Sequence, residues 1–290
     1  MRIAESELIL NPDGSIYHLH LLPEDLADTV ITVGDPDRVN LISARFDTME
    51  VIKQHREFRS HTGTYKGKRL TVLSTGIGPD NIDIVCNELD ALVNIDLKNR
   101  SVKRDLRSLE IIRVGTSGGL QPDVEVDSIV SGTIGIGFDN LLHFYGGDME
   151  FLDHDFANAF ISHTKWNPDN SKPYVVHADE GLLARFSSED IRPGITTTNV
   201  GFYGPQGRVI RLPLHDADMN AKIASFEHRG QKITNLEMET AAIYGMSKML
   251  GHKALSLNII LANRANGTFS VNPHKAIERL ITKTLDILVQ

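Results

Sequence analysis

Two acidic residues separated by a methionine, Glu237-Met238-Glu239, form the stretch of this sequence with the most direct chemical meaning. They stand just before Thr240–Tyr244, an apolar, small-residue run that predicts a buried helix. A buried carboxylate is costly unless it is paired or hydrogen-bonded. The pair therefore either places negative charge at the N-terminus of a helix or grips a polyol such as a sugar diol, and the rest of the chain must decide.

A glycine turn after a predicted strand offers a place for an anion. Thr29–Val33 is a largely β-branched run without charge, which is typical of a strand buried on both faces, and Gly34-Asp-Pro-Asp-Arg38 follows it. A strand, a glycine turn and a helix start present backbone N–H groups to an anion. Arg38 would add a permanent positive charge there, although a surface helix arginine is the alternative interpretation.

A second candidate anion site follows the predicted strand Leu109–Val114, which Gly115-Thr116-Ser117-Gly118-Gly119 is expected to close. This run formally matches the G-x-S-x-G nucleophile elbow of hydrolases, but the elbow requires a helix directly after it. Residues 120–127 instead indicate a loop, so we set the hydrolase interpretation aside. We favour an anion nest in which Arg113 leads in and Thr116 offers its hydroxyl and backbone N–H groups.

A glycine- and proline-containing loop, Gly201–Arg208, carries groups that suit a planar heterocycle. Phe202 can stack on a ring, the Gln206 amide offers a donor and an acceptor, and Arg208 offers only donors. The alternative interpretation is an exposed polar loop.

The remaining pattern supplies the elements that position these residues. Further strands are predicted at 60–65, 70–74, 128–133, 174–177 and 195–200, and the last strand at 254–262; residues 137–173 are expected to include loops over the site. Asn272-Pro273 predicts the start of an amphipathic terminal helix. Strands alternate with helices to the end without a linker, which favours one α/β domain over residues 1–290.

Composition excludes several classes of protein. The formal charge of −8 over 290 residues argues against a nucleic-acid binder, which normally carries a basic face. The single cysteine, Cys86, excludes an internal disulfide, suits a reducing compartment and lies on an apolar helical face, which indicates a buried thiol. The first residues lack the apolar core of a signal peptide, and no apolar run is long enough for a bilayer. We expect a cytoplasmic protein without a membrane partner.

A third glycine turn, Thr75-Gly76-Ile77-Gly78-Pro79-Asp80-Asn81, opens a predicted helix and resembles the start of a dinucleotide fingerprint. Asn81 stands where that fingerprint requires its third glycine, so we reject a dinucleotide site.

Taken together, the motifs are similar to those of a known family. Seven of them occur in its order: Gly34-Asp-Pro-Asp-Arg38, His55-Arg-Glu-Phe58, Ser74-Thr-Gly-Ile-Gly78, Arg113-Val-Gly-Thr-Ser-Gly118, Phe202-Tyr-x-x-Gln206-x-Arg208, Glu237-Met-Glu239 and Asn263-Arg264. The chain resembles the nucleoside phosphorylases of the uridine phosphorylase type. The resemblance implies a central mixed, barrel-like sheet flanked by helices. It also implies phosphorolysis of uridine to uracil and ribose 1-phosphate, with inorganic phosphate as co-substrate and without an organic cofactor or a metal.

The resemblance also implies a role for each matching residue. Gly34, Arg38, Arg113 and Thr116 look like the phosphate site, together with Arg56 from a neighbouring subunit. His18, also from a neighbour, looks like the contact to the ribose 5′-hydroxyl, with Glu237, Met238 and Glu239 below the ribose. Phe202, Gln206 and Arg208 look like the base site, and Arg113, Glu239, Arg208 and Gln206 look like the catalytic groups. Sites shared in this way imply a homo-oligomer, either a dimer or a hexamer built as a trimer of dimers.

Two departures from the family pattern stand out. Gly76-Ile-Gly-Pro-Asp-Asn81 replaces the usual Gly-Ile-Gly-Gly-Pro-Ser, which puts in doubt a monovalent-cation site near Glu57, and Gly204-Pro205 exchanges a proline and a glycine beside the base site. Three other functions remain open: a purine nucleoside phosphorylase, a nucleosidase that uses water, and an inactive nucleoside-binding protein. The purine enzymes usually place an aspartate where Asn263 stands, which favours a pyrimidine.

Overall fold

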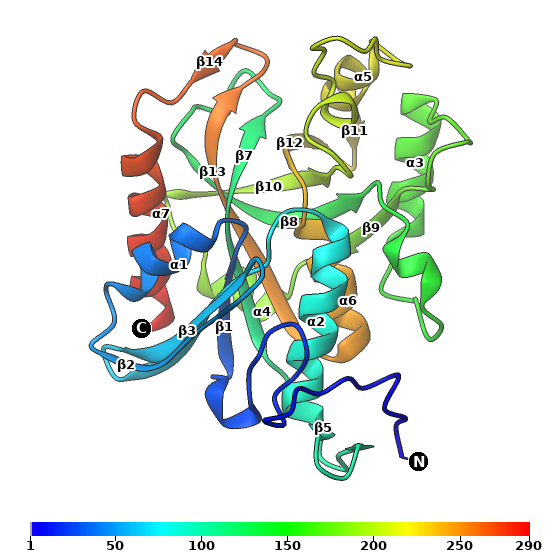
Figure 1. Ribbon diagram of the computed structural model, residues 1–290. Helices are drawn as coiled ribbons and strands as arrows, with labels where there is room; N and C mark the ends of the chain where they lie inside the picture. Colours follow the sequence, from blue (N-terminus) through cyan, green and yellow to red (C-terminus); the bar gives the residue numbers. More distant parts are fainter. Residues whose placement is uncertain (1) are drawn as a thin grey trace.

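A 12-stranded mixed sheet carries the fold of residues 2–290, the part of the chain that the computed structural model describes (Figure 1). The strands run in the order β11-β12-β10-β8-β13-β7-β1-β4-β3-β2, with β9 beside β8 and β14 beside β13. Their bounds are β1 Thr29–Val33, β2 Thr48–His55, β3 Phe58–Tyr65, β4 Lys68–Ser74, β7 Glu110–Gly119, β8 Ile129–Gly137, β9 Tyr174–His177, β10 Ile191–Thr198, β11 Glu227–His228, β12 Gln231–Glu237, β13 Lys253–Asn263 and β14 Thr268–Phe269. Strands β5 (Ile95–Asp96) and β6 (Ser101–Val102) pair separately.

One pairing closes part of this sheet into a barrel. Strand β12 runs parallel to β10 and also pairs antiparallel with β7, at Asn235 with Gly119 and Leu236 with Gly118. Strands β12, β10, β8, β13 and β7 therefore form a ring, and β1, β4, β3 and β2 extend from β7. The predicted α/β class with a mixed, barrel-like sheet is confirmed. The extent of the domain, residues 1–290, stays a prediction, and Met1 lies outside the described residues.

Helices α1 to α7 cover the sheet (Figure 1). They are α1 Pro36–Ser43, α2 Pro79–Asn94, α3 His154–Thr164, α4 Glu180–Arg185, α5 Met219–Ser225, α6 Thr240–Leu250 and α7 Pro273–Leu288; short 3-10 turns lie at Pro23–Asp25, Leu141–Phe144 and Gly204–Gln206. Helix α6 contacts β8, β10 and β13 on one side and α2 on the other, whereas α7 contacts β13 and β7.

The predicted buried helix after Glu239 is α6. Residues Thr240–Ser247 are all buried, and a Cβ added at Gly135 of β8 would lie only 2.9 Å from the Cα of Ala241. Small residues at this crossing therefore let the helix lie directly on the barrel. The terminal helix is also as predicted, because the Asn272 side chain accepts a 3.0 Å hydrogen bond from the backbone N–H of Lys275.

The apolar pattern identified most of the strands. All five residues of β1 are buried, as expected for a strand covered on both faces. The hairpin of β3 and β4, the helix after Gly78 and the strand at 174–177 also lie where the sequence predicts them, and β8 and β10 overlap the strands predicted at 128–133 and 195–200. Cys86 is a free, buried cysteine on α2, as predicted.

Two expectations about local structure were wrong. Gly115–Gly119 does not close a strand; it continues β7, which pairs with β13 along its whole length. A further short strand, β14, follows β13 because the chain turns back at residues 264–267 to pair Phe269 with Ala262. Residues 137–173 hold α3, a 3-10 turn and the loops that the sequence predicts. Residues of the loop 166–171 line a pocket next to Gly204, Pro205 and Gly207, and a position of these loops over the site stays a prediction.

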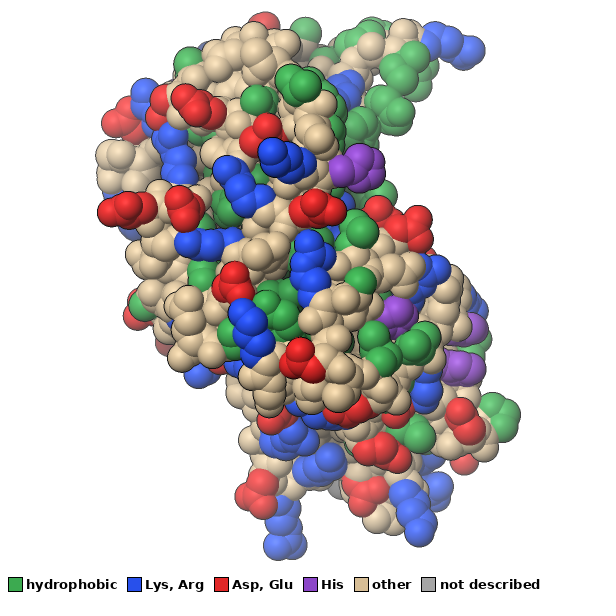
Figure 2. Space-filling model, turned by 90° about the vertical axis from the view of Figure 1, so that its left-hand side faces the viewer, with side chains coloured by type: hydrophobic (Ala, Val, Ile, Leu, Met, Phe, Trp, Pro, Cys, Tyr) green, Lys and Arg blue, Asp and Glu red, His purple; other side chains and the backbone are tan. Residues whose placement is uncertain are grey.

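The surface mixes both signs of charge. On the face shown in Figure 2, lysine and arginine side chains alternate with aspartate and glutamate side chains. Within residues 2–290, no helix is both long enough and apolar enough to cross a membrane.

Candidate active site

A cavity of about 560 Å³ opens where the carboxyl ends of several barrel strands meet. Parallel strands place their carboxyl ends at the same edge, where open α/β sheets usually bind ligands. Ten of the predicted site residues line this one cavity: Gly34, Arg38, Arg113, Thr116, Phe202, Gln206, Arg208, Glu237, Met238 and Glu239. The remaining lining residues are Asp35, Pro36, Ile77, Ser117, Gly118, Leu236, Leu261, Ala262 and Phe269.

Two arginines converge at one end of the cavity. Arg38, on α1, is 9% exposed and its Nη1 donates to the carbonyl of Val114 at 3.2 Å, so the interpretation of Arg38 as a surface arginine is wrong. Burial lowers the pKa of Arg38, and the positive charge of Arg113 lowers it further. Two buried guanidinium groups repel each other, and an anion bound between them would offset that repulsion.

The side chain of Thr116 lines the same end, but the expected backbone nest is absent from this strand segment of the described chain. Thr116 pairs with Ile259 within the extended ladder between β7 and β13. A nest requires successive residues in a turn conformation. Thr116 can therefore offer its hydroxyl, and at residues 114–117 the edge of β7 that faces away from β13 has no paired strand among the described residues.

Arg113 is paired with both acidic residues of the Glu237-x-Glu239 motif. Its Nη2 lies 3.2 Å from Oε2 of Glu237 and donates to Oε2 of Glu239. Burial acts to lower the pKa of Arg113, but the charges of Glu239 and Glu237 outweigh it and raise the pKa. Burial raises the pKa of Glu239, against the opposing charge of Arg113. The arginine therefore stays charged in a closed environment.

The sequence left two roles open for the acidic pair, a charge at a helix N-terminus and a contact to a sugar diol, and each role fits a different one of the two residues. Glu237 ends β12, and its carboxylate accepts hydrogen bonds from the backbone N–H groups of Glu239 (2.9 Å) and Thr240 (3.0 Å) and from the Thr198 hydroxyl (2.8 Å). Its negative charge thus stands at the N-terminus of α6. The carboxylate of Glu239 accepts hydrogen bonds from the backbone N–H of Gly78 at 2.9 Å and from Arg113. Glu239 also lines the cavity, where its oxygens can accept further hydrogen bonds.

The other end of the cavity carries a flat, polar arrangement. The guanidinium carbon of Arg208 lies 3.8 Å from the ring centroid of Phe202, and its Nη1 donates to the side-chain carbonyl of Gln206. Gln206 is 3% exposed, and its backbone carbonyl accepts hydrogen bonds from Arg264 and from Asn220. Burial, followed by the charge of Arg264, lowers the pKa of Arg208. Gln206 is therefore anchored from both sides, whereas Phe202, Tyr203, Gly204 and Pro205 of the same loop are exposed.

Two predicted site residues lie away from this cavity within one subunit. His18 pairs its Nδ1 with Oε1 of Glu88 at 2.7 Å, and the guanidinium of Arg56 lies 5.8 Å from the Tyr17 ring centroid. The His18 ring also lies against Phe58, with 6.3 Å between ring centroids. The two residues therefore belong to one separate surface.

Several lining residues had no signal in the sequence. Phe269 comes from β14, a strand with no signal in the local sequence pattern, and it is 63% exposed at the cavity. Leu261 and Ala262 lie in a strand identified only by its apolar character. Gly78 belongs to the glycine turn Thr75–Asn81, but nothing in that turn indicated that its backbone N–H contacts Glu239.

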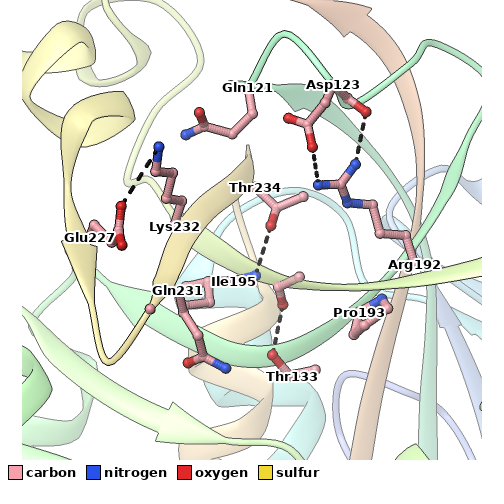
Figure 3. A pocket seen from close by; sticks show the side chains of 12 residues that line it. Gln121, Asp123, Thr133, Arg192, Pro193, Ile195, Glu227, Gln231, Lys232 and Thr234 are labelled. Carbon is pink, nitrogen blue, oxygen red and sulfur yellow. Dashed lines mark hydrogen bonds and ion pairs between the residues drawn. The ribbon is translucent and has the colours of Figure 1, made fainter.

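A second cleft, of about 370 Å³, lies beside β10 and β12 and contains none of the predicted site residues (Figure 3). Its charged groups are paired with each other, Arg192 with Asp123 at 2.6 Å and Lys232 with Glu227 at 3.7 Å. The hydroxyl of Thr234 accepts from the backbone N–H of Ile195 at 3.1 Å. These contacts support the sheet, so the first cavity is the candidate active site.

Comparison with known proteins places the chain in a family, because a model of the phosphorylase superfamily matches residues 28–290. The chain belongs to this superfamily. A Trypanosoma brucei nucleoside phosphorylase described as showing uridine phosphorylase activity is 30% identical, with a TM-score of 0.87 over 97% of this chain and 99% of that one. The uridine phosphorylase of Thermococcus kodakarensis is 28% identical over 96% of this chain and 88% of its own. A DeoD-type purine nucleoside phosphorylase of Myxococcus xanthus is 27% identical over 93% of this chain and 95% of its own. These matches confirm the predicted family and enzyme class.

Proposed function

We propose that this member of the phosphorylase superfamily cleaves uridine with phosphate to give uracil and ribose 1-phosphate. The observation that supports the proposal most directly is the convergence of three groups in one cavity. Arg38 and Arg113 suit phosphate, Glu239 suits a ribose diol, and Gln206 with Arg208 suits the polar edge of a pyrimidine.

The reaction breaks the bond between N1 of uracil and C1′ of ribose. The electron pair of that bond leaves on the base, and a phosphate oxygen forms the new bond to C1′. Positive charge therefore develops on the ribosyl carbon, where phosphate held by Arg113 and Arg38 stabilises it. Negative charge develops on the base, where Gln206 and Arg208 donate hydrogen bonds to the pyrimidine oxygens. The uracil anion takes up a proton on release.

The ribose has a carboxylate acceptor and an apolar floor. Glu239 lines the cavity next to Met238, and its carboxylate can accept hydrogen bonds from the 2′- and 3′-hydroxyls. Glu237 supports this arrangement from below, because its three protein donors fix the start of α6. Phosphate is the co-substrate of this chemistry, and the predicted lack of an organic cofactor and of a metal stays a prediction.

His18 and Arg56 enter the proposal as contributions of a neighbouring subunit. Within one subunit they lie on a surface away from the cavity, so they can reach a site only across a subunit boundary. The proposal therefore includes a homo-oligomer, a dimer or a trimer of dimers, in which each site is completed by its neighbour. The cytoplasmic location also stays a prediction.

A purine nucleoside phosphorylase is the second candidate, since relatives of that kind are 26–30% identical to this chain. The acidic residues that line the cavity argue for a pyrimidine instead. Asp35 caps α1, Glu237 is bound to α6, and Glu239 lies beside Arg113, so each is committed away from Gln206. Asn263 donates its amide hydrogens to the carbonyls of Gln121 and Val124 and holds a loop.

The test is an assay of free base with uridine, thymidine and inosine, each with and without phosphate. The proposal expects uracil from uridine only when phosphate is present. Release without phosphate would instead indicate a nucleosidase, and release of hypoxanthine alone would indicate a purine enzyme. No release from any nucleoside, with binding retained in calorimetry, would indicate a nucleoside-binding protein.

A further inference from the structure

We propose that Asn258 and Gly115 are positioning residues that aim the guanidinium of Arg113 at phosphate, and that they thereby set the affinity of the site for phosphate. The inference rests on the proposed function and extends it to two residues outside the cavity lining. Its basis is the set of contacts that surround Arg113 inside the barrel.

Asn258 fixes one edge of the guanidinium. It is completely buried on β13, and its Oδ1 accepts a 2.8 Å hydrogen bond from Nη1 of Arg113. The opposite edge, Nη2, is taken by Glu239 and Glu237. Because a guanidinium is planar, contacts at both edges determine the plane in which its remaining N–H groups point. Asn258 therefore decides how much of Arg113 faces the cavity.

The amide of Asn258 has a fixed orientation. Arginine can only donate, so the amide must present its oxygen to Arg113. Its Nδ2 then donates to the Oγ of Ser256 at 3.1 Å, and the same Oγ receives the Thr240 hydroxyl at 2.8 Å. Thr240 directly follows Glu239. This chain of hydrogen bonds links Arg113, which is proposed to bind phosphate, to the start of α6, which follows Glu239, the residue proposed to bind the sugar.

Gly115 leaves space for the guanidinium of Arg113 beside β7. It lies two residues after Arg113 on β7, so both residues face the same side of the strand. A Cβ added at Gly115 would overlap the guanidinium of Arg113 and would lie 2.6 Å from Oδ1 of Asn258. The glycine therefore leaves room for the arginine to fold back along its own strand, where it meets Asn258.

The neutral charge of Asn258 also matters. Arg113 already faces two carboxylates at one edge. A third acid at position 258 would hold Nη1 more strongly but would add negative charge beside the place where phosphate binds. An amide gives the hydrogen bond without that repulsion.

The central experiment replaces Asn258 by aspartate, which keeps the shape of the side chain and adds a negative charge. Steady-state kinetics would vary phosphate and uridine separately, and calorimetry would measure the binding of inorganic phosphate alone. We expect N258D to raise the phosphate KM and Kd about tenfold or more, since the added carboxylate charge repels the phosphate anion at a site shielded from water. The uridine KM should change far less.

Gly115→Ala tests the same geometry from the opposite side and is expected to give the same selective loss of phosphate affinity. Asn94→Asp is the matched control, because Asn94 is a buried amide at the end of α2 whose partners are Asp90 and Arg107, away from the cavity. It is expected to lower stability and to leave the ratio of the two KM values unchanged. Circular dichroism and thermal unfolding would select the variants that fold.

The outcomes separate the inference from the function beneath it. If the parent enzyme is active and depends on phosphate, but folded N258D or G115A binds phosphate as the parent does, the inference is wrong and the proposed function still stands. A parent enzyme that releases no base in the presence of phosphate would overturn the function. Equal losses of phosphate and uridine affinity in N258D and G115A would indicate general disruption and would also overturn the inference.

Discussion

The backbone N–H of Gly78 donates a 2.9 Å hydrogen bond to Oε1 of Glu239, although the two residues are 161 positions apart. Gly78 is the residue before α2 and has a φ of 104°, a conformation that glycine adopts far more readily than other residues. The start of one helix thus contacts the carboxylate that precedes another. This contact places Glu239 between a backbone donor and Arg113 in a buried site.

The pH dependence of activity should report this carboxylate. Burial raises the pKa of Glu239 above the ordinary glutamate value of 4.5. As the pH falls through a raised pKa, the carboxylate gains a proton and loses its charged contact with Arg113. We therefore expect kcat/KM for uridine to fall on the acid side at a pH above 4.5. Glu239→Gln should be less active and should lose this acid limb.

Phosphate also titrates but affects both enzymes equally, so the difference between the two profiles isolates Glu239. An acid limb of the same position in E239Q would show that another group controls it.

Glu237 should matter more for folding than for the chemical step. Its two oxygens accept from Thr198, Glu239 and Thr240. A glutamine in its place offers one acceptor oxygen, so buried donors lose their partner at a cost of about 1–3 kcal/mol. We expect E237Q to lower the free energy of unfolding by this amount in urea titration, with Thr198→Val giving a loss of the same kind. Unchanged stability in both variants would contradict this role.

Arg208 should contribute to the chemical step. It lies over Phe202, contacts Gln206 and lines the cavity. Removing a preorganised donor typically lowers the rate by about 10² to 10³. We expect Arg208→Ala to reduce uridine phosphorolysis by this factor, whereas Arg211→Ala, at an exposed arginine three residues further along the loop, should leave it nearly unchanged. A fully active R208A enzyme would show that the base end of the cavity is misassigned.

Shared active sites can be tested by mixing subunits. Arg56→Ala removes the arginine that a subunit donates to its neighbour's site but leaves the subunit's own cavity intact. Arg208→Ala removes an arginine of the subunit's own cavity but leaves the donated Arg56 intact. In a mixed dimer one site carries both defects and the other carries neither. Equal amounts, unfolded and refolded together, should therefore recover roughly a quarter of the parent activity. Recovery of no activity above the two separate variants would argue that each subunit has a complete site.

Cys86 should be chemically inert in the folded protein. It is 2% exposed on α2, and burial, with smaller effects of Asp83 and Asp90, raises the pKa of its thiol to about 12. The reactive thiolate is therefore scarce near neutral pH. A coloured thiol reagent should react very slowly with the native protein and rapidly after denaturation. Fast reaction of the native protein would mean that α2 opens locally.

Much of the fold follows from local pattern. Uncharged β-branched runs such as Thr29–Val33 predicted buried strands, and Asn272-Pro273 predicted the start of α7 through capping alone. These signals act over a few residues, so a sequence displays them directly. The boundaries at Gly115–Gly119 were missed because glycine-rich composition favours a turn, whereas pairing with β13 on one side and β12 on the other keeps the segment extended.

By itself the sequence determined which residue types were available for chemistry and in what order they occur, including the acidic pair, Arg38 and Arg113 beside glycine runs, and the Gln206-x-Arg208 loop. Only the tertiary structure decided which role each of these residues has. It assigned Glu237 to the start of α6, and it brought Gly78 to Glu239 and Asn258 to Arg113 from distant elements. The reason is that barrel closure and sheet register depend on interactions between residues more than a hundred positions apart, and short-range patterns carry no information about such pairs.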